Sequence, residues 1–313
     1  MRIDILIPNY NGTDLIKKNL EKVIKAIERE KGGIIIIDDG STFQEREKLR
    51  EFIKDVSDKA PTTNIDLLET GKNLGFSSAI NKGAAHSKAE LIVLLNTDVV
   101  PEEDFLDPII EDFTKDKDLF GVGCMDKSIE DGDTVLRGRG IGTWEKGFIS
   151  HRRGEVDHKD TFWVSGGSSV LRREDFLKLG GFDEIYDPFY WEDIDLSYRA
   201  QKAGYNILFE NKSVVEHRHS EGSIKKHYGD FRIKRIAYRN QFIFVWKNIS
   251  DFNLFLSYLF WLPYHCLFAL LRFDIAFFFG FLSAIIKIPV IIQKRIKQGK
   301  SYKRLDREII FSR

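Results

Sequence analysis

Short apolar runs alternate with longer amphipathic stretches through the first 120 residues. The apolar runs predict β-strands at residues 3–7, 34–37, 64–68 and 91–95. The stretches between them predict helices at 13–29, 45–56 and 77–86. Thr13 is the expected N-cap of the first helix. Since the second and fourth runs are apolar without alternation, we expect both of these strands to be buried on both faces.

Alternation of strand and helix at this spacing predicts parallel strands joined by right-handed crossovers. In such a sheet the ligand binds outside the carboxyl ends of the strands. The segments at those ends are Pro8-Asn9-Tyr10, Asp38-Asp39-Gly40, Glu69-Thr70-Gly71 and Asn96-Thr97-Asp98. We therefore expect this edge of the sheet to bind a polar ligand.

The pattern becomes less regular after residue 118. Glycine-rich turns there separate short strands that we predict at residues 162–165, 169–171 and 206–209. One helix is predicted at residues 192–203, where Gly204 ends it. Basic and aromatic side chains are interleaved in a further helix predicted at residues 223–248. A dense apolar region at 252–292 and a basic tail at 293–313 follow.

The chain of 313 residues carries 48 Lys and Arg against 48 Asp and Glu. This balance argues against a general nucleic-acid binder, which has a basic surplus. Cys124 and Cys266 form no Cys-x-x-Cys pair, so a disulfide framework or zinc knuckle is not expected and a reducing compartment fits. Because Asp4 interrupts the apolar N-terminal run, we expect no signal peptide and a cytosolic catalytic part.

Asp98 is the first candidate for chemistry, because it follows the buried strand predicted at residues 91–95. A carboxylate in this position suits a hard divalent cation, Mg²⁺ or Mn²⁺, that bridges two phosphates. The alternative is that Asp98 caps the segment that begins at Pro101. His217 and His219 follow a strand-like run, and either could complete a metal site as a neutral imidazole. Surface histidines near a turn are the alternative.

Three carboxylates lie within the segment Trp191-Glu192-Asp193-Ile194-Asp195, at the predicted start of a helix. Acids in a first turn interact favourably with the helix dipole, which explains one or two of them. Phe189 and Tyr190 precede the segment. Aromatic rings beside acids suit a sugar-binding cleft in which one carboxylate acts as a general base.

Two loops remain ambiguous on their own. Asp38-Asp39-Gly40-Ser41 is consistent with an ordinary turn. Gly71-Lys72-Asn73-Leu74-Gly75-Phe76 is similar to a phosphate-binding loop, but it has neither the G-x-G-x-x-G nor the Walker A spacing. Glycine turns explain it equally well.

The order of these motifs resembles that of family 2 glycosyltransferases, which have a GT-A fold. The matching segments are residues 5–12, 36–42, 73–76, 81–83, 94–98, 165–167, 180–184, 192–199 and 204–205, and finally His217. No single segment is diagnostic, whereas the ordered set is specific and extends over about residues 3–219. Within the family the chain is most similar to rhamnosyl- and galactofuranosyltransferases of bacterial surface polysaccharides.

The resemblance implies an α/β fold of the GT-A type, a Rossmann-like and mostly parallel sheet flanked by helices. Residues 1–222 would form the catalytic domain, with a nucleotide-sugar-binding half at 1–120 and an acceptor-binding half at 121–222. Residues 223–313 would form a basic and apolar helical region.

The resemblance also implies roles for single residues. The nucleotide sugar would contact Pro8, Tyr10, Asp39, Asn73, Gly75, Asn96 and Asp98, with Asp39 at the nucleobase. Asp98 and His217 would bind the metal, although Asn96 replaces the first acid of the family's D-x-D motif. Asp193 would be the general base. Gly166, Trp191, Glu192 and Asp195 would face the acceptor, with Glu192 and Asp195 as structural or acceptor-orienting neighbours of the base.

The chemistry of glycosyl transfer agrees with these roles. A divalent cation offsets the charge that builds on the departing diphosphate. One carboxylate deprotonates the acceptor hydroxyl, which attacks an anomeric carbon of oxocarbenium character from the opposite face. One base and one displacement give inversion at that carbon.

Residues 252–271 contain no charged side chain and are long enough to span a bilayer, although Pro263 and His265 interrupt them. Basic residues flank the apolar region on both sides. This arrangement favours a re-entrant hairpin or interfacial helices on the cytoplasmic face of the membrane, where a lipid-linked acceptor would lie. The alternative is a helical subdomain that packs on the catalytic domain or forms a dimer.

Two other functions remain open at this stage. A nucleotidyltransferase also uses parallel strands and a metal, but it normally has a glycine-rich loop with Arg or Lys after its first strand. A membrane-tethered carbohydrate-binding protein without activity would be favoured if Asp98, Asp193 and His217 did not converge in one cleft.

Overall fold

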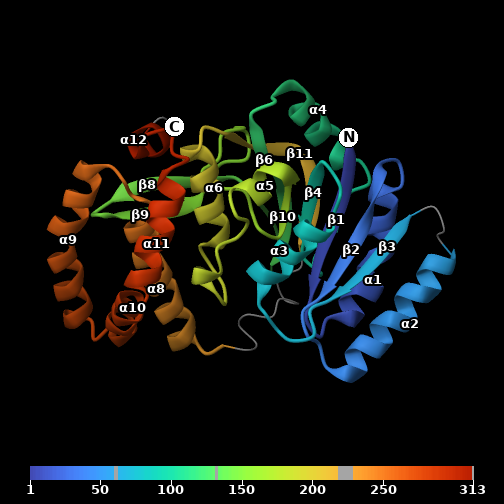
Figure 1. Cartoon of the computed structure of the whole chain (residues 1–313), viewed down its shortest axis with the longest axis horizontal. Coiled ribbons are helices and arrows are strands. Elements are labelled where there is room, and N and C mark those ends of the chain that lie inside the picture. The colour runs from blue at the N-terminus through green and yellow to red at the C-terminus, as the bar shows by residue number, and fades with distance from the viewer. Residues whose placement is uncertain (60–62, 131–132, 218–227, 312–313) are drawn as a thin grey trace.

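A computed structural model describes residues 1–59, 63–130, 133–217 and 228–311 (Figure 1). In this described part, nine strands form one sheet in the order β3-β2-β1-β4-β10-β6-β11-β5, with β7 paired to β6. Their bounds are β1 (Arg2–Asn9), β2 (Lys31–Asp38), β3 (Asn64–Glu69), β4 (Leu91–Leu95), β5 (Val99–Pro101), β6 (Leu119–Glu130), β7 (Asp133–Arg137), β10 (Ser168–Arg172) and β11 (Asn206–His217).

The sheet is parallel in its first half and mixed in its second. Strands β3, β2, β1 and β4 are all parallel, as the alternation of strand and helix predicts. Strand β10 then runs antiparallel to both β4 and β6, while β6 and β11 are parallel to each other. The parallel strands thus form the first half of the sheet, and the antiparallel strands β10, β5 and β7 make the second half mixed.

Helices cover both faces of the sheet. On one face lie α1 (Thr13–Ile27), α2 (Phe43–Lys59) and α4 (Leu106–Lys115), and on the other lie α3 (Phe76–His86), α5 (Arg173–Lys178) and α6 (Glu192–Lys202). The isoleucine run of β2 divides between them. Ile34 and Ile36 face the first set, Ile35 and Ile37 face the second, and all four are at most 3% exposed. Burial of this strand on both faces is confirmed.

Two local predictions are wrong. Residues 162–165 lie outside every strand, because Phe162 and Val164 fill hydrophobic clusters from an irregular segment. Thr13 does not cap α1, since its hydroxyl donates to the carbonyl of Glu45 and the N-cap position belongs to Gly12.

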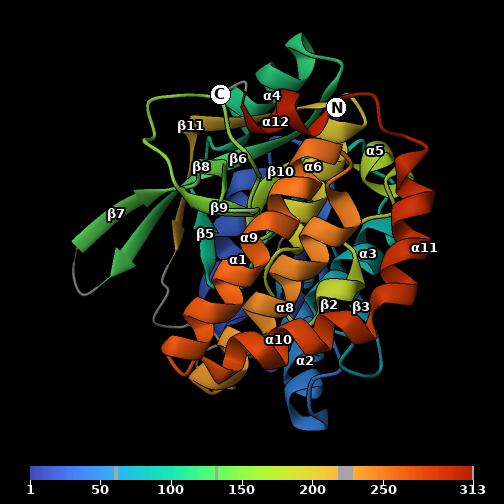
Figure 2. The same ribbon diagram turned by 90° about the vertical axis from the view of Figure 1, so that its left-hand side faces the viewer.

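The C-terminal helices pack beside the sheet domain (Figures 1 and 2). They are α8 (Asp230–Asn248), α9 (Phe252–Leu271), α10 (Ile275–Ile286), α11 (Ile288–Gly299) and α12 (Asp306–Ile310). The expected helix at 223–248 is found from Asp230 onward, and its first residues lie outside the described ones. A hairpin of β8 (Gly140–Glu145) and β9 (Phe148–Arg153) contributes Phe148 and Ile149 to the hydrophobic cluster that the helices form. The C-terminal region thus shares a core with residues 121–222.

Candidate active site

Strands β1 and β2 end side by side at the edge where a ligand was expected. Asn9 is in register with Asp38, and the Asn9 Nδ2 atom donates to Asp38 Oδ1 over 3.0 Å. The backbone N–H of Asp39 donates to the Asn9 carbonyl over 2.7 Å. These bonds fix the two strand ends and the turns that follow them. Pro8 is half-buried at this edge and Tyr10 is 49% exposed beside it.

Asp39 holds the glycine-containing loop between β3 and α3. Its carboxylate accepts hydrogen bonds from the backbone N–H groups of Leu74 (2.9 Å) and Gly75 (2.8 Å) and from the Thr70 hydroxyl (3.1 Å). Gly75 has φ +89°, which favours glycine at this position. Asn73 is exposed on the same loop. The residues predicted to bind the nucleotide sugar, at the ends of β1 and β2 and on the loop before α3, therefore form one continuous edge.

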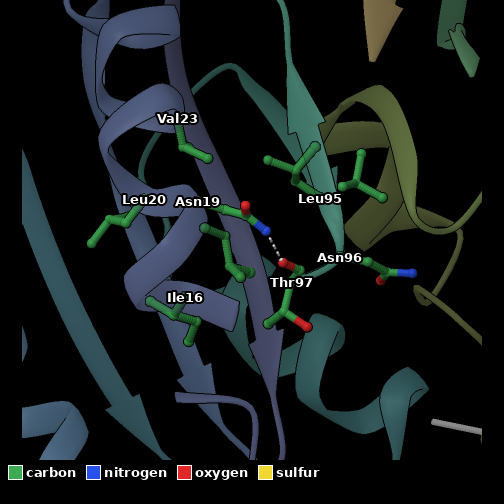
Figure 3. Close-up of a pocket in the computed structure, with 9 residues that line it drawn as sticks. Ile16, Asn19, Leu20, Val23, Leu95, Asn96 and Thr97 are labelled. Atoms are coloured by element: carbon green, nitrogen blue, oxygen red, sulfur yellow. Dashed lines mark hydrogen bonds between the residues drawn. The ribbon is translucent and has the colours of Figure 1, made fainter. Parts of the chain in front are cut away.

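The segment that follows β4 is fixed from two sides. Asn19 of α1 donates from Nδ2 to the Thr97 carbonyl over 2.8 Å, beside a small apolar cavity of about 10 Å³ (Figure 3). The backbone N–H of Asn96 donates to the Gly167 carbonyl over 3.0 Å. A Cβ atom on Gly167 would lie 2.5 Å from Asn96 Nδ2, so any other residue there would displace the Asn96 side chain. The cavity is too small for a substrate, and its walls serve to position the strand end.

Asp98, which lies between β4 and β5, meets His217, the last residue of β11. The Nε2 atom of His217 lies 3.3 Å from Asp98 Oδ2. The Nδ1 atom of the same ring lies 3.0 Å from Asp126 Oδ2, on β6. The imidazole therefore bridges two carboxylates through its two nitrogens. His219, the other histidine considered from the sequence, lies outside the described residues.

The surroundings of His217 suit a cation. Burial alone would lower the pKa of His217, but hydrogen bonds and charge from Asp126 and Asp98 outweigh it and raise the pKa to about 9. The two carboxylates thus favour positive charge at the imidazole. A carboxylate that binds the far ring nitrogen of a metal-ligating histidine is a recurrent feature of metal sites, because it fixes the tautomer and the ring orientation. Asp98 and His217 Nε2 therefore fit a divalent cation, with Asp126 behind the imidazole.

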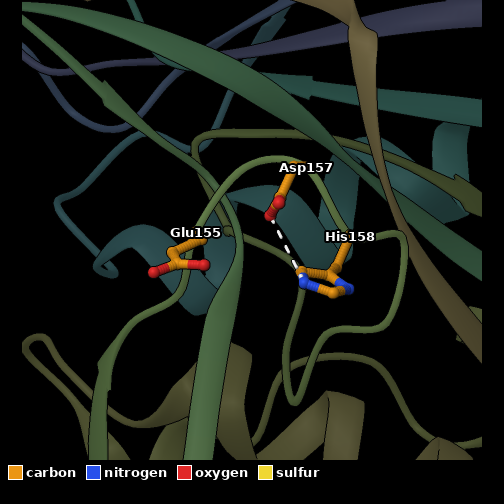
Figure 4. A group of neighbouring side chains, drawn as sticks. All are labelled: Glu155, Asp157 and His158. Carbon is orange, nitrogen blue, oxygen red and sulfur yellow. Dashed lines mark ion pairs between the residues drawn. The ribbon is translucent and has the colours of Figure 1, made fainter.

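A second group of potential ligands lies elsewhere. Glu155, Asp157 and His158 are all exposed on the loop after β9 (Figure 4). This loop pairs with the first part of β11, where Asp160 bridges Leu208, whereas His217 lies nine residues further along that strand. Nothing else at this exposed loop points to a ligand, so we assign it no role.

Asp193 lies in the first turn of α6 and is half-buried. Its Oδ1 accepts from the Ile194 N–H (2.8 Å), and its Oδ2 lies 3.4 Å from the Gly166 N–H. A Cβ atom on buried Gly166 would meet the Phe76 ring at 3.2 Å and Asp193 Cβ at 3.7 Å. Since Gly166 is adjacent to Gly167, whose carbonyl binds Asn96, the turn connects Asp193 to the strand end that carries Asp98.

Glu192 and Asp193 form a pair of interacting acids. Burial raises the pKa of both, and the charge of Asp193 raises that of Glu192 further, to about 8. Within the described residues, Glu192 Oε2 is buried without a hydrogen-bond partner. A pKa of about 8 keeps the Glu192 carboxyl protonated at neutral pH.

Asp187 is a third acid in this region. A Cβ atom on Gly75 would lie 3.7 Å from Asp187 Oδ1, so the carboxylate borders the donor-side loop. Burial raises the pKa of Asp187 to about 6, although a hydrogen bond with the Ser77 side chain opposes the rise. Arg239 of α8 donates from Nη2 to the backbone carbonyl of Tyr186 over 3.0 Å and also to that of Asp187.

The aromatic residues before α6 divide between core and surface. The Trp191 ring is 5% exposed and packs against Phe244 and His151, with centroid distances of 5.1 and 5.3 Å. Tyr190 is 41% exposed. The placement favours a core role for Trp191, whereas Tyr190 has an open ring that could stack on a sugar.

Asp195 is fully buried between α6 and α8. It accepts hydrogen bonds from the Tyr186 hydroxyl (2.8 Å) and from Arg199 Nε (2.7 Å), and it pairs with Lys247 Nζ at 2.8 Å. Burial alone would raise its pKa, but Lys247 and Arg199 outweigh burial and lower it. Lys247 also pairs with Asp183 at 2.6 Å. Of the two roles considered for Asp195, this placement favours the structural one.

Two residues of this site were missed in the sequence. Asp126 follows the run 119–125 of β6 as Asp98 follows β4, and that parallel was the available signal. Asp187 lies near Asp193 in the sequence, but its sequence context does not distinguish a cleft position from a surface one.

Comparison with known proteins agrees with this geometry. The family model "Glycosyl transferase family 2" matches residues 4–180. A probable N-acetylgalactosaminyltransferase 9 of Caenorhabditis elegans is 28% identical over 201 residues, which cover 59% of this chain and 33% of the relative. An N-acetylglucosaminyl-diphospho-decaprenol L-rhamnosyltransferase of Mycobacterium tuberculosis is 26% identical over 193 residues, which cover 51% of this chain and 61% of the relative.

Solved structures share the fold. A crystal structure of GalNAc-T7 with UDP, GalNAc and Mn²⁺ superposes with a TM-score of 0.65 at 19% identity, covering 81% of this chain and 49% of that one. The expected GT-A-like α/β fold is thereby confirmed. The chain spans 33 to 61% of the length of the first three curated relatives that it matches.

Proposed function

The chain belongs to glycosyl transferase family 2, and from this premise we propose that it transfers a sugar from a nucleoside-diphosphate sugar to a hydroxyl of a glycan or lipid-linked acceptor, with inversion. One observation carries the proposal. Asp98 and His217 meet at the same sheet edge that the Gly166-Gly167 turn joins to Asp193. A cation-binding pair and a carboxylate base are the two components that this reaction requires.

Asp98 and His217 would hold the divalent cation. The mixed donor set favours Mn²⁺ over Mg²⁺, because imidazole nitrogen is a good ligand for transition metals whereas Mg²⁺ prefers oxygen. When bound, the cation offsets the negative charge that develops on the departing diphosphate. GalNAc-T7, which shares the fold, was crystallised with UDP and Mn²⁺.

Asp193 would act as the general base. The acceptor oxygen forms a bond to the anomeric carbon while the bond from that carbon to the diphosphate oxygen breaks. The hydroxyl proton passes to Asp193. Glu192 keeps its own proton at neutral pH, so it can donate a hydrogen bond to the acceptor without competing as a base.

The two alternatives have less support. A non-catalytic binding protein would not need a base joined to a cation-binding pair at one edge. A nucleotidyltransferase would need an Arg or Lys side chain in the loop after β1 to bind the triphosphate. The segment at the end of β1 is Asn9-Tyr10-Asn11-Gly12, which has neither.

The proposed location is the cytoplasmic face of the membrane, with the C-terminal helices on its surface. Helix α9 is long and apolar enough to cross a membrane, but Leu254, Tyr258 and Ala269 are buried against the rest of the protein. Its other side is apolar and open, with Phe260 76% and Leu271 69% exposed. An interfacial arrangement satisfies both sides of the helix.

The function is tested by the release of free nucleoside diphosphate from a panel of nucleotide sugars. Each donor is incubated with Mn²⁺, with Mg²⁺ or with EDTA, in the presence of a membrane lipid extract as acceptor. We expect metal-dependent release from one donor and its loss in Asp193→Asn. If a folded wild-type protein releases no diphosphate from any donor, glycosyl transfer is refuted and carbohydrate binding without catalysis becomes the better account.

A further inference from the structure

A large cavity lies between the β8–β9 hairpin and helices α8, α9 and α10. Its volume is about 760 Å³, within the usual range of pockets for small organic ligands. Aromatic and aliphatic side chains make most of its wall, among them Phe148, Phe268 and Phe277. The cavity therefore suits a ligand with a substantial apolar part.

Three cations also line this cavity, namely Lys146, Lys234 and Arg272, against the two acids Glu145 and Asp274. Lys234 is neutralised by Asp274 at 2.8 Å. The other two contact aromatic residues. Lys146 Nζ donates to the Tyr264 hydroxyl over 3.3 Å and lies 4.8 Å from the centroid of that ring, and the Arg272 guanidinium lies 4.0 Å from the centroid of Phe268. Lys146 and Arg272 can therefore pair with an incoming anion without first breaking an ion pair.

The cavity opens onto the exposed apolar side of α9 and α10. Phe268, Phe273 and Ile275 line it and are themselves 41%, 87% and 57% exposed. This surface continues along the helices with four further apolar residues that are 49 to 69% exposed, namely Leu267, Leu270, Leu271 and Phe279. An anion held inside the cavity could thus remain attached to a hydrocarbon chain that lies on this surface or in a membrane against it.

Strand β9 and helix α8 separate the cavity from the candidate active site. Ser150 lines the cavity, whereas the next residue, His151, packs against Trp191. On α8, Tyr238 lines the cavity, whereas the next residue, Arg239, binds the backbone at Asp187. A ligand here would therefore not occupy the site of sugar transfer.

We propose that this cavity binds the phosphate head group of a membrane lipid through Lys146 and Arg272, with the lipid chain leaving across α9 and α10. Such a lipid matches both features of the cavity. Lys146 and Arg272 would pair with its phosphate, and the exposed apolar side of α9 and α10 would contact its hydrocarbon chain. The inference rests on the proposed membrane location only for the source of the lipid.

Dodecyl phosphate, kept below its micelle concentration, is a suitable probe. Trp261 reports on binding through intrinsic fluorescence, because its ring lies 5.8 Å from Lys146 Nζ. We expect saturable quenching by dodecyl phosphate and at least tenfold weaker binding of dodecyl maltoside, which has the same chain without the charge. Inorganic phosphate, which has the charge without the chain, should bind at least tenfold more weakly as well.

Variants locate the site. Lys146→Gln with Arg272→Gln should weaken dodecyl phosphate binding at least tenfold. Lys297→Gln with Lys300→Gln, two exposed lysines at and just after the end of α11, should leave it unchanged. Ala276→Leu, which narrows the cavity without removing charge, should weaken binding too, and circular dichroism verifies the fold of each variant. The proposal would be overturned if dodecyl maltoside or inorganic phosphate bound as tightly as dodecyl phosphate. It would also be overturned if the Lys146→Gln, Arg272→Gln variant bound dodecyl phosphate as tightly as the wild type. Because the titration contains no sugar donor or metal, its result is independent of glycosyl transfer.

Discussion

The imidazole of His217 is held by Asp126, whose Oδ2 lies 3.0 Å from Nδ1. Strand pairing brings the two residues together, because β6 and β11 are parallel and Asp126 is in register with Val215, two residues before His217. With Nδ1 occupied, the other ring nitrogen faces Asp98. The pairing therefore selects which nitrogen is presented to a cation.

This relationship predicts that Asp126→Asn weakens Mn²⁺ binding about 10- to 100-fold, the usual effect of removing a carboxylate behind a metal-ligating histidine. Electron paramagnetic resonance of free Mn²⁺ measures the affinity without any sugar substrate. Asp133→Asn, an exposed acid on neighbouring β7, is the matched control and should bind Mn²⁺ as the wild type does. An Asp126→Asn protein with wild-type affinity would show that His217 needs no orientation by Asp126.

The two adjacent acids of α6 should respond differently to amide substitution. Glu192, with a pKa of about 8, is neutral at pH 7, so Glu192→Gln should retain activity within a few-fold. Asp193→Asn should lose roughly 10²- to 10⁴-fold in kcat, the typical contribution of a general base. Diphosphate release at pH 7 compares the two variants. Similar losses in both would contradict the assignment of a single base.

The pH profile follows from the same pair. Burial raises the pKa of Asp193, and the base acts only when ionised. Activity should therefore fall with decreasing pH at a value above the ~3.9 of an exposed aspartate. The acidic limb of kcat/KM for the donor measures this value, and an acidic limb at or below pH 4 would argue against a buried base.

The buried ion pairs between α6 and α8 should dominate the attachment of the C-terminal helices. Lys247 is fully buried between Asp183 and Asp195, so Lys247→Ala should lower the free energy of unfolding by about 3–5 kcal/mol. Lys294 also pairs with Asp183, at 2.9 Å, but is 38% exposed, so Lys294→Ala should cost less than about 1 kcal/mol. Chemical denaturation measures both, and equal effects would mean that the buried network contributes no more than a surface pair.

The first 95 residues could be predicted closely because each strand and helix there is encoded by its own local pattern. The strand at 91–95 matches β4 residue for residue, and its polar end is where the site begins. The partnership of Asp126 with His217 could not be predicted in this way, since 91 residues separate them and only the pairing of β6 with β11 joins them.

Side-chain direction was the second limit. Trp191 has φ +79°, a left-handed backbone that turns its ring into the core, and a sequence of aromatics beside acids does not encode this turn. The burial of Lys247 was equally invisible in the sequence. It belongs to a helix rich in basic residues, and only the packing of α8 against α6 reveals that it is buried beside Asp195.

The stereochemistry of donor hydrolysis tests the central claim most directly. Water replaces the acceptor, so the measurement needs only the nucleotide sugar that the panel identifies, and ¹H NMR records the anomer that forms first, before mutarotation. A single displacement with Asp193 as base predicts that the free sugar first appears with the anomeric configuration opposite to that of the donor, and that Asp193→Asn abolishes its formation. Initial release with retained configuration, or undiminished release by Asp193→Asn, would contradict the account.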